Sequence, residues 1–410
     1  MNINLNILKV SIPFFLITTF IYPIKPFFAP NINFFLLILF TFLYIFFNPK
    51  ETYRLVNNKD IIITVVVFLI LVMLNTMSML INSNFEFVYI GISIKYLFTM
   101  LMAICIISFI TEKGFSEEKL IKYFIYFSLL LAFSCILEFF IPPIKKILAF
   151  VFISTDNIHY DRSFRVKGFV SGGGATLSFI LSISLMMSHG LFLKKKNILY
   201  IIVALILTIG IIFVGRTGIV LASISWFIFF LLFLFLSNAK NIIYLILISI
   251  IIIFTMDFLM LSEEENDIIF KYSFEIFTNY FEKGKLESGS TTAVMNMYFI
   301  PDLKHFIFGE GLYKAYKTYQ PTDIGYIKQL LSTGIFGSIL FYVLMIYVQF
   351  KAYHYFKDII GIPFMILILC TFWIVEGKEP VFIQSYACRL LLLMFIYSLF
   401  RKEPKMIRDT

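Results

Sequence analysis

Long apolar runs fill most of this chain and limit what it can fold into. Runs such as 61–81 and 87–110 reach or exceed the ~20 residues that an α-helix needs to cross a bilayer. The chain is 60% hydrophobic and 14% charged, whereas charged residues make up about 25% of ordinary soluble domains. A soluble fold of this length cannot hide so much apolar surface, and strand-type alternation is absent. We therefore expect an all-α polytopic membrane protein.

The apolar runs predict about twelve transmembrane helices, because each run is separated from the next by a short polar stretch. The two predicted spans that flank Arg216 are short, so they could also form one broken helix. The predicted spans are 8–22, 32–47, 61–81, 87–110, 120–141, 175–193, 198–214, 217–236, 242–261, 326–350, 359–375 and 381–400.

Lysine and arginine residues predict the orientation of these spans. Cytoplasmic loops carry an excess of positive charge, and a cytoplasmic N-terminus places clusters such as Lys194–Lys196 on the inside. The short outer loops then hold only Lys25, Arg216 and Lys378. Both termini are expected in the cytoplasm.

This orientation divides the chain into four parts and puts its two longest polar segments outside. The parts are a membrane bundle with its outer segment 142–174, one large outer loop, a group of about three C-terminal spans and a cytoplasmic tail. Their bounds are 1–261, 262–325, 326–400 and 401–410.

Several classes of function are disfavoured by the residues that the chain lacks. Its four cysteines all fall in apolar runs and have no CxxC or Cys/His spacing, so we expect no metal site. No Walker A or Rossmann fingerprint is present, so we expect no nucleotide cofactor. The net charge of +9 is placed in loops where it sets topology, so we expect no nucleic-acid partner.

Arg216 interrupts two apolar runs within Gly215-Arg216-Thr217-Gly218 at the expected outer face. A guanidinium group binds phosphate oxygens through two parallel hydrogen bonds, and flanking glycines let the backbone approach a ligand closely. The alternative is a topological turn with a snorkelling arginine.

A second basic element precedes the predicted span 175–193. Arg165, Lys167 and Gly168 lie shortly before the run Gly172-Gly173-Gly174. Glycines before a helix can form a nest of N–H groups that favours an anion. The alternative is a flexible loop that enters a helix.

The end of the large outer loop offers an acid and several tyrosines. Asp323 is a candidate general base, although an aspartate at this place is equally suited to cap a helix. Tyr313, Tyr316 and Tyr319 recur every three residues, which predicts an aromatic stripe for sugar stacking or for anchoring at the membrane interface. Tyr326 and Lys328 follow at the membrane edge.

A few ionisable residues fall within apolar runs, where charge is costly and often functional. Lys95 with Glu138, or Glu376 with Arg389, would form buried structural pairs. Arg389 is also a candidate for binding substrate.

Together these features resemble the O-antigen polymerase and ligase superfamily (Wzy and WaaL types). The resemblance is carried by Arg165 to Gly168, by Gly215-Arg216-Thr217-Gly218, and by a third stretch. The third stretch runs from Phe306-Ile307-Phe308-Gly309-Glu310-Gly311-Leu312 through Asp323-Ile324-Gly325-Tyr326 to Gly334-Ile335-Phe336-Gly337.

The resemblance implies a GT-C-like glycosyltransferase that needs no metal, in the bacterial inner membrane, with its large loop (262–325) in the periplasm. It implies that undecaprenyl-diphosphate-linked oligosaccharides are donor and acceptor, and that a chain-length regulator and a flippase are partners. Arg165 and Arg216 would bind the diphosphate, and Asp323 would act on the acceptor hydroxyl. The residues expected to bind substrate are Lys167, Gly168, Tyr313, Tyr316, Tyr326, Lys328 and Arg389.

Two other functions remain open from the sequence. One is a ligase that moves finished glycan to lipid A core, although ligases usually carry a histidine near the position of Asp323. The other is a transporter or flippase for lipid-linked sugars, which would account for Lys95, Glu138 and Arg389.

Overall fold

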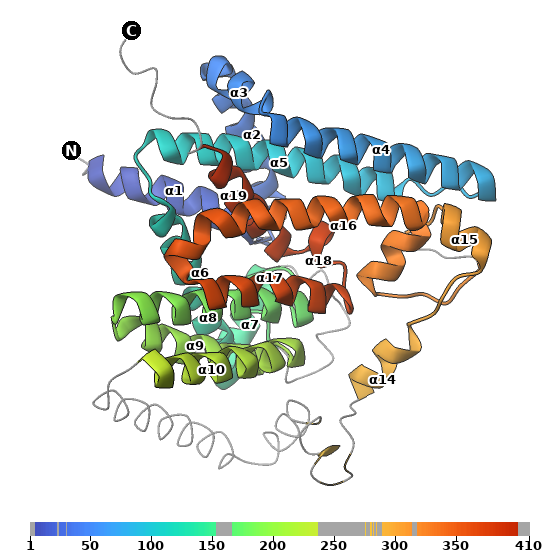
Figure 1. Ribbon diagram of the computed structural model, residues 1–410. Helices are drawn as coiled ribbons and strands as arrows, with labels where there is room; N and C mark the ends of the chain where they lie inside the picture. Colours follow the sequence, from blue (N-terminus) through green and yellow to red (C-terminus); the bar gives the residue numbers. More distant parts are fainter. Residues whose placement is uncertain are drawn as a thin grey trace.

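The structure, a computed structural model, describes residues 5–22, 24–29, 31–152, 166–236, 275, 279–280, 282, 284, 289–313 and 318–400. The predicted span 242–261, most of 262–288 and the tail 401–410 lie outside these residues. Within them every extended element is a helix, and one isolated β-bridge joins Pro26 to Phe152 (Figure 1). The helices are α1 (Leu5–Ile21), α2 (Ile32–Phe47), α3 (Pro49–Val56), α4 (Lys59–Asn82), α5 (Val88–Glu112), α6 (Glu117–Phe140), α7 (Pro142–Val151), α8 (Gly174–Lys195), α9 (Leu199–Val214), α10 (Arg216–Leu236), α14 (Gly289–Asn296), α15 (Leu303–Phe308), α16 (Gly325–Ile360), α17 (Ile362–Glu376), α18 (Val381–Gln384) and α19 (Tyr386–Phe400).

The length and apolarity of these helices confirm a multi-pass α-helical membrane protein. Six of them are long and apolar enough to cross a bilayer: α4, α5, α6, α8, α10 and α16. A seventh arises if α2 and α3, which meet at a bend of 104°, count as one span. Shorter apolar helices occur in α1 and at α9, α17 and α19. The total of twelve spans stays a prediction.

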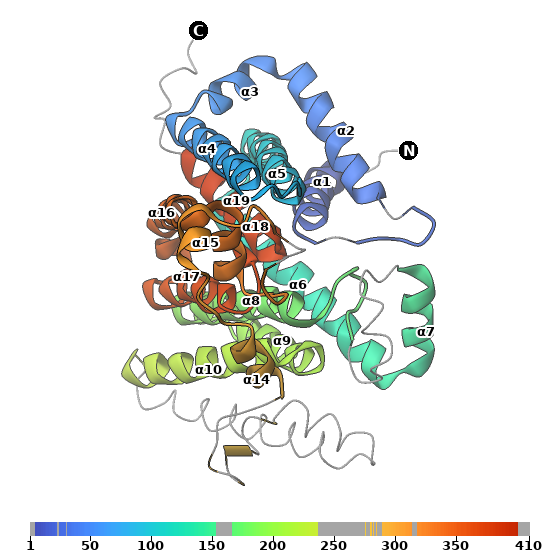
Figure 2. The ribbon, with the colours of Figure 1, turned by 90° about the vertical axis from the view of Figure 1, so that its right-hand side faces the viewer.

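Helix α8 lies at the centre of the bundle. Of its most apolar 18-residue window, 89% is buried, against 33% for α4. Its small residues let neighbouring helices approach closely: a Cβ on Gly190 would lie 2.0 Å from the carbonyl oxygen of Ile360 in α16. In contrast α7, which buries none of its residues, lies at the edge of the bundle (Figure 2).

Long-range polar contacts join helix ends that the charge pattern places on the same side. At the predicted inner side, the Tyr397 hydroxyl donates to the carbonyl of Phe115 (2.7 Å), and Lys351 pairs with Asp60 (2.7 Å). At the predicted outer side, the Asn82 amide donates to the carbonyl of Gly309 (2.9 Å). The two ends of the bundle are therefore the ones expected, and which end faces the cytoplasm stays a prediction.

Helices α9 and α10 form an antiparallel hairpin and are two helices, not one broken helix. The Trp226 ring N–H donates to the Thr208 hydroxyl at 2.9 Å. These residues are 18 apart, which would be about 27 Å along a continuous helix. The hairpin turn at Gly215 places Arg216 at the first position of α10.

Helix α16 runs from Gly325 to Ile360 and is broken at Gly334, whose φ of 68° is left-handed. A Cβ there would lie 2.1 Å from the carbonyl oxygen of Ile307 in α15. Only glycine suits a position that combines this φ with such close contact. Beyond the predicted end of the span at residue 350, the helix continues for ten more residues. Residues 309–311 pack against this break, and the N–H groups of Glu310 and Gly311 donate to the carbonyl of Leu331.

Candidate functional site

The turn that carries Arg216 is pinned to the N-terminus of α8. We call residues 215–218 the Arg216 loop. A Cβ on Gly215 would lie 3.2 Å from the carbonyl oxygen of Gly174, and one on Gly218 would lie 2.6 Å from the Cβ of Ser178. The Gly218 N–H donates to the Ser178 hydroxyl at 3.2 Å. The glycines of this motif therefore let the turn pack directly on α8.

Arg216 is nearly buried and contacts the large outer loop. Its side chain is 11% exposed, and its Nη1 lies 2.5 Å from the Glu275 carboxylate. The other oxygen of that carboxylate accepts the N–H of Gly289, the first residue of α14, at 3.0 Å. Glu275 thus ties Arg216 to α14.

A second cation lies beside the Arg216 loop. The Lys378 ammonium, from the turn after α17, donates to the Thr217 hydroxyl at 2.8 Å. The N-termini of α8 and α10 are also here, and helix N-termini carry partial positive charge. Two cations and two helix N-termini meet here, and the Glu275 carboxylate is the negative group that contacts Arg216. This excess of positive charge suits a phosphate group. In the sequence, Lys378 stands out only as a cation at the outer end of the predicted span 359–375.

The segment that follows Arg165 runs next to the Arg216 loop, and Arg165 itself lies outside the described residues. The Glu138 carboxylate accepts the N–H groups of Lys167 (3.0 Å) and Gly168 (2.7 Å). Glu138 therefore anchors this loop, and the expected pair with Lys95 does not explain its burial. The Lys167 side chain is buried and its ammonium donates to the carbonyl of Phe152 at 3.4 Å.

Gly168 has a left-handed φ of 62°, and a Cβ there would lie 2.3 Å from the Ser134 hydroxyl of α6. Its role in this structure is close packing on α6. Further along, a Cβ on Gly173 would lie 3.5 Å from the Cβ of Lys167, and Gly174 contacts Gly215. The glycine run therefore joins the loop of Lys167 to the Arg216 loop.

Asp323 is exposed and does not cap a helix. The N-cap of α16 is Ile324, so the capping interpretation of Asp323 is wrong. Its side chain is 70% exposed and lies 3.2 Å from the ammonium of Lys328. The Lys328 ammonium is also 5.7 Å from the centre of the Tyr313 ring. Asp323 is therefore an ionic partner of Lys328 that remains open to solvent.

The tyrosines expected to form a stripe point in different directions. Tyr313 is 1% exposed and packs on Tyr89, so its ring does not offer an open face to a sugar. Tyr316 lies outside the described residues. Tyr319 stacks on Phe299, with ring centres 4.9 Å apart. The Tyr326 hydroxyl donates to the carbonyl of Trp373 at 2.7 Å and fixes the start of α16 against α17.

The outer loop holds an acid–histidine pair that the sequence reasoning did not predict. Nδ1 of His305 lies 2.7 Å from the Asp302 carboxylate, and the Tyr319 hydroxyl donates to the same carboxylate at 2.9 Å. The backbone N–H of His305 and the hydroxyl of Tyr319 hold the pKa of Asp302 at about 2. Asp302 is therefore ionised at neutral pH and orients the imidazole ring. The signal was the Asp-Leu-Lys-His spacing, which puts both side chains on one turn of a helix.

The segment 309–313, which we call the buried loop, enters the bundle between α4 and the break in α16. The carbonyl of Leu331 accepts the N–H groups of Glu310 (2.6 Å) and Gly311 (3.0 Å). Three asparagine amides hold the loop from the other side. Asn75 donates to Ser332 (2.8 Å) and Gly311 (3.4 Å), Asn82 to Gly309 (2.9 Å) and Asn84 to Glu310 (3.2 Å).

A series of contacts joins residues 297–331 to the turn that holds Lys378, beside the Arg216 loop. Residues Ile324, Ile327 and Leu331 form a small apolar cluster with Met297, Phe299, Tyr319 and Tyr326. The Tyr298 hydroxyl donates to the carbonyl of Gly377 at 2.6 Å, next to Lys378. The Asp302–His305 pair therefore belongs to the same outer layer as Arg216.

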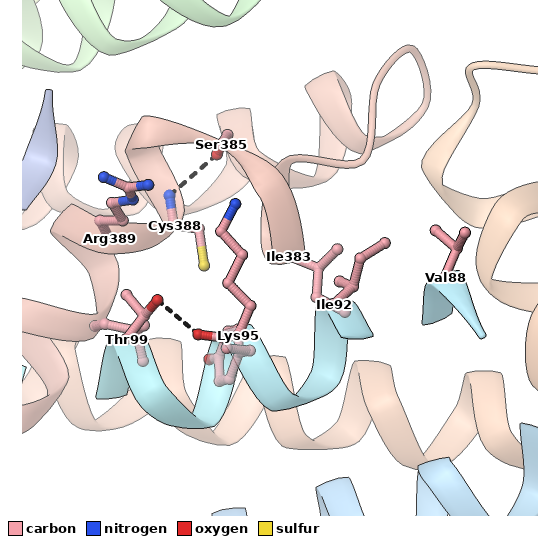
Figure 3. A pocket seen from close by; sticks show the side chains of 10 residues that line it. Val88, Ile92, Lys95, Thr99, Ile383, Ser385, Cys388 and Arg389 are labelled. Atoms are coloured by element: carbon pink, nitrogen blue, oxygen red, sulfur yellow. Dashed lines mark hydrogen bonds between the residues drawn. The ribbon is translucent and has the colours of Figure 1, made fainter. Parts of the chain in front are cut away.

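Glu376 and Arg389 are each stabilised by hydrogen bonds to other groups and not by the expected ion pair. Glu376 accepts the N–H groups of Val381 (2.7 Å) and Phe382 (3.2 Å) and the Tyr342 hydroxyl (3.1 Å). Arg389 donates from Nη1 to the carbonyl of Phe20 at 2.8 Å. Arg389 instead shares the lining of a cavity with Lys95 (Figure 3).

Among the described residues, no group of three histidine, cysteine, aspartate or glutamate side chains could hold a metal ion. No family, no curated protein and no solved structure matches this chain.

Proposed function

We propose that this protein is a glycosyltransferase that polymerises undecaprenyl-diphosphate-linked oligosaccharides at the periplasmic face of the bacterial inner membrane. The observation that carries the proposal is the Arg216 loop. A nearly buried arginine, a lysine from a distant helix end and two helix N-termini meet where the large outer loop is tied down by Glu275. Such a place suits the phosphates of a lipid-linked donor.

The proposed reaction joins two lipid-linked chains. The hydroxyl at the non-reducing end of a new repeat unit attacks the anomeric carbon of the growing chain. The anomeric C–O bond to the diphosphate breaks, a glycosidic bond forms, and the hydroxyl proton passes to a base. Undecaprenyl diphosphate leaves with the bonding electron pair, and Arg216 and Lys378 stabilise the charge that develops on it.

Two groups compete for the role of the base. The Asp323 carboxylate is open to solvent and already paired with the Lys328 ammonium. His305 is held by an ionised Asp302, and an imidazole oriented in this way is a frequent general base. We favour His305. A ligase stays the alternative, although ligases usually carry their histidine near the position of Asp323 and not near that of His305.

A second candidate function is transport of lipid-linked sugars. It is favoured by the cavity that Lys95 and Arg389 line. A flippase moves a lipid-linked sugar without joining it to another. Purified protein in liposomes with labelled lipid-linked repeats separates the two readings, because an elongated product without added proteins requires an enzyme.

The first test is the glycan ladder of a deletion strain complemented with Arg216→Ala. Loss of one electrostatic stabiliser lowers a rate by about 10²–10³-fold, so we expect single-repeat glycans from protein that still reaches the membrane. Arg54→Ala, which removes an exposed pair with Glu51, is the matched control and should give the full ladder. Long chains from Arg216→Ala would remove Arg216 from the mechanism. Free long chains on the carrier lipid in the deletion strain would indicate a ligase.

A further inference from the structure

A cavity between α5 and the α18–α19 turn is lined by two cations at membrane depth. Its volume is about 320 Å³, and Lys95 and Arg389 both line it (Figure 3). Lys95 is seven residues into α5, which is about 10 Å from the start of the helix. Arg389 is in the first turn of α19. Both therefore lie near the same outer end of the bundle.

A second cavity adjoins the first through the same two residues. It has a volume of about 220 Å³ and extends toward α1 and α2, where Lys25 also lines it. Three cations thus line two neighbouring cavities. None of the described residues that line either cavity is acidic.

The position of these charges points to an anion as the ligand. An ionised side chain within a membrane bundle is costly and is usually retained for a function. The Nη1 group of Arg389 donates to the carbonyl of Phe20, and a guanidinium has five N–H donors, so others can reach a ligand in the cavity. Arginine and lysine together are the usual binders of phosphate oxygens.

The remaining lining indicates that the anion carries a hydrocarbon chain. Apolar side chains of α5 and α19, including Ile92 and Leu392, line the first cavity together with the cations. Lys95 is exposed, so the cavity is open at the side of the bundle and is not sealed inside it. In a bilayer this opening faces the lipid. Cations beside apolar side chains suit a lipid, whose phosphate headgroup would contact the cations and whose hydrocarbon chain would contact the apolar side chains.

We propose that this cavity binds the phosphate headgroup of a lipid that enters sideways from the outer leaflet. The site is separate from the Arg216 loop and involves no glycan transfer. Its ligand can be a polyprenyl diphosphate or an anionic phospholipid, because both present phosphate oxygens on a hydrocarbon chain.

The test is lipid retention by the full-length purified protein, measured by native mass spectrometry. The probes are geranylgeranyl diphosphate, phosphatidylglycerol, phosphatidylcholine and inorganic diphosphate. We expect the wild type to retain geranylgeranyl diphosphate or phosphatidylglycerol, and Arg389→Gln and Lys95→Gln to bind it about tenfold more weakly, as loss of a charged hydrogen bond predicts. Lys113→Gln, at the other end of α5, is the matched control and should bind as the wild type does.

The competition between probes identifies the source of the lipid. Displacement of phosphatidylglycerol by geranylgeranyl diphosphate indicates the carrier lipid, and the reverse order indicates an ordinary phospholipid of the bilayer. Equal binding by the three variants and the wild type would overturn the proposal. So would phosphatidylcholine binding as tightly as the anionic lipids, or inorganic diphosphate binding as tightly as its lipid form. If Arg389→Gln does not fold, the exposed Lys95→Gln still decides the outcome. A failed polymerisation assay would leave this result unaffected.

Discussion

Buried carboxylates in this protein are held by backbone amides. Glu138 accepts two N–H groups of the loop before α8, and Glu376 accepts two from the first residues of α18. A carboxylate that accepts several such bonds is stabilised without a cation. Each glutamate therefore fixes a segment at the outer end of the bundle. Arg389 and Lys95 line a cavity at the same end.

His305→Asn tests the proposed base. We expect the rate of glycan transfer to fall by about 10²–10⁴-fold, the usual contribution of a general base. Asp302→Asn should lower the rate too, because an amide orients the imidazole ring without the negative charge. Steady-state transfer in liposomes measures both. Asp323→Asn is the comparison, and a loss of activity there with none in His305→Asn would move the role to Asp323.

The pH dependence of the Asp302 contact follows from its lowered pKa of about 2. A carboxyl group whose pKa is depressed by folding stabilises the protein above its unfolded pKa, and this contribution is lost as pH falls through the folded value. The contact with His305 should therefore persist from neutral pH down to about pH 4 and disappear toward pH 2. Carbon-13 NMR of the labelled Asp302 carboxyl in detergent measures this titration. A midpoint near 4 would contradict the lowered pKa.

At the scale of elements, a helical hairpin and a break within one helix shape the outer end of the bundle. The hairpin of α9 and α10 presents Arg216 at its turn, and the break in α16 admits the buried loop. Both depend on glycine at a position where another side chain would collide with a backbone or a neighbouring helix. Their geometry is therefore more sensitive to substitution than the lipid-facing surface is.

Gly334→Ala should destabilise the protein more than Gly361→Ala does. Both positions have positive φ angles, 68° and 96°, so both alanine variants lose about 1–3 kcal/mol from backbone strain. Only Gly334 has a neighbour in the way, the Ile307 carbonyl oxygen at 2.1 Å, whereas nothing lies within 4 Å of a Cβ at Gly361. Thermal unfolding in detergent measures the difference. Equal melting temperatures would show that the buried loop does not press on the break.

Asn75→Leu should loosen the buried loop. It removes the donor to the buried Ser332 carbonyl, and a lost bond of this kind costs about 1–3 kcal/mol. The neighbouring Thr76→Val is the control, because the Thr76 hydroxyl donates only within its own helix, to Val72. Protease cleavage between residues 309 and 331 reports loosening. Resistance equal to that of the control would assign the loop's stability to the Leu331 carbonyl instead.

At the scale of the whole molecule, the polar contacts sort into two ends of one apolar bundle. The contacts of Asp60, Phe115 and Lys351 gather at one end, and those of Thr217, Gly309 and Gly377 gather at the other. Polar groups avoid the bilayer core, so this sorting is what a multi-pass protein requires. The candidate site and the cationic cavity both belong to the second end.

The orientation of the two ends can be tested by cysteine labelling in intact cells. Cysteines at Lys146 and Asp323 should react with a membrane-impermeant maleimide from outside. Cysteines at Glu51 and Lys113 should react only after the membrane is opened. Three native cysteines are buried, and Cys370 is exposed in α17, so Cys370→Ser is a suitable parent. Labelling of Lys113→Cys in intact cells would invert the predicted topology.

The sequence by itself determined the helical membrane architecture, the places where most described helices begin and end, and the two sides of the bundle. Apolar length and charge asymmetry are local properties, so they can be read along the chain. The predicted ends were wrong where a helix continues beyond its apolar run, as α16 does to Ile360.

Only the tertiary structure decided which group each polar side chain meets. Asn75 bonds a carbonyl 257 residues away, and Arg389 bonds one 369 residues away. No local pattern specifies such partners, because they depend on how distant helices pack. For the same reason the sequence predicts a binding role for Arg216 but none for Lys378 beside it, and it does not pair His305 with the Asp302 that orients it.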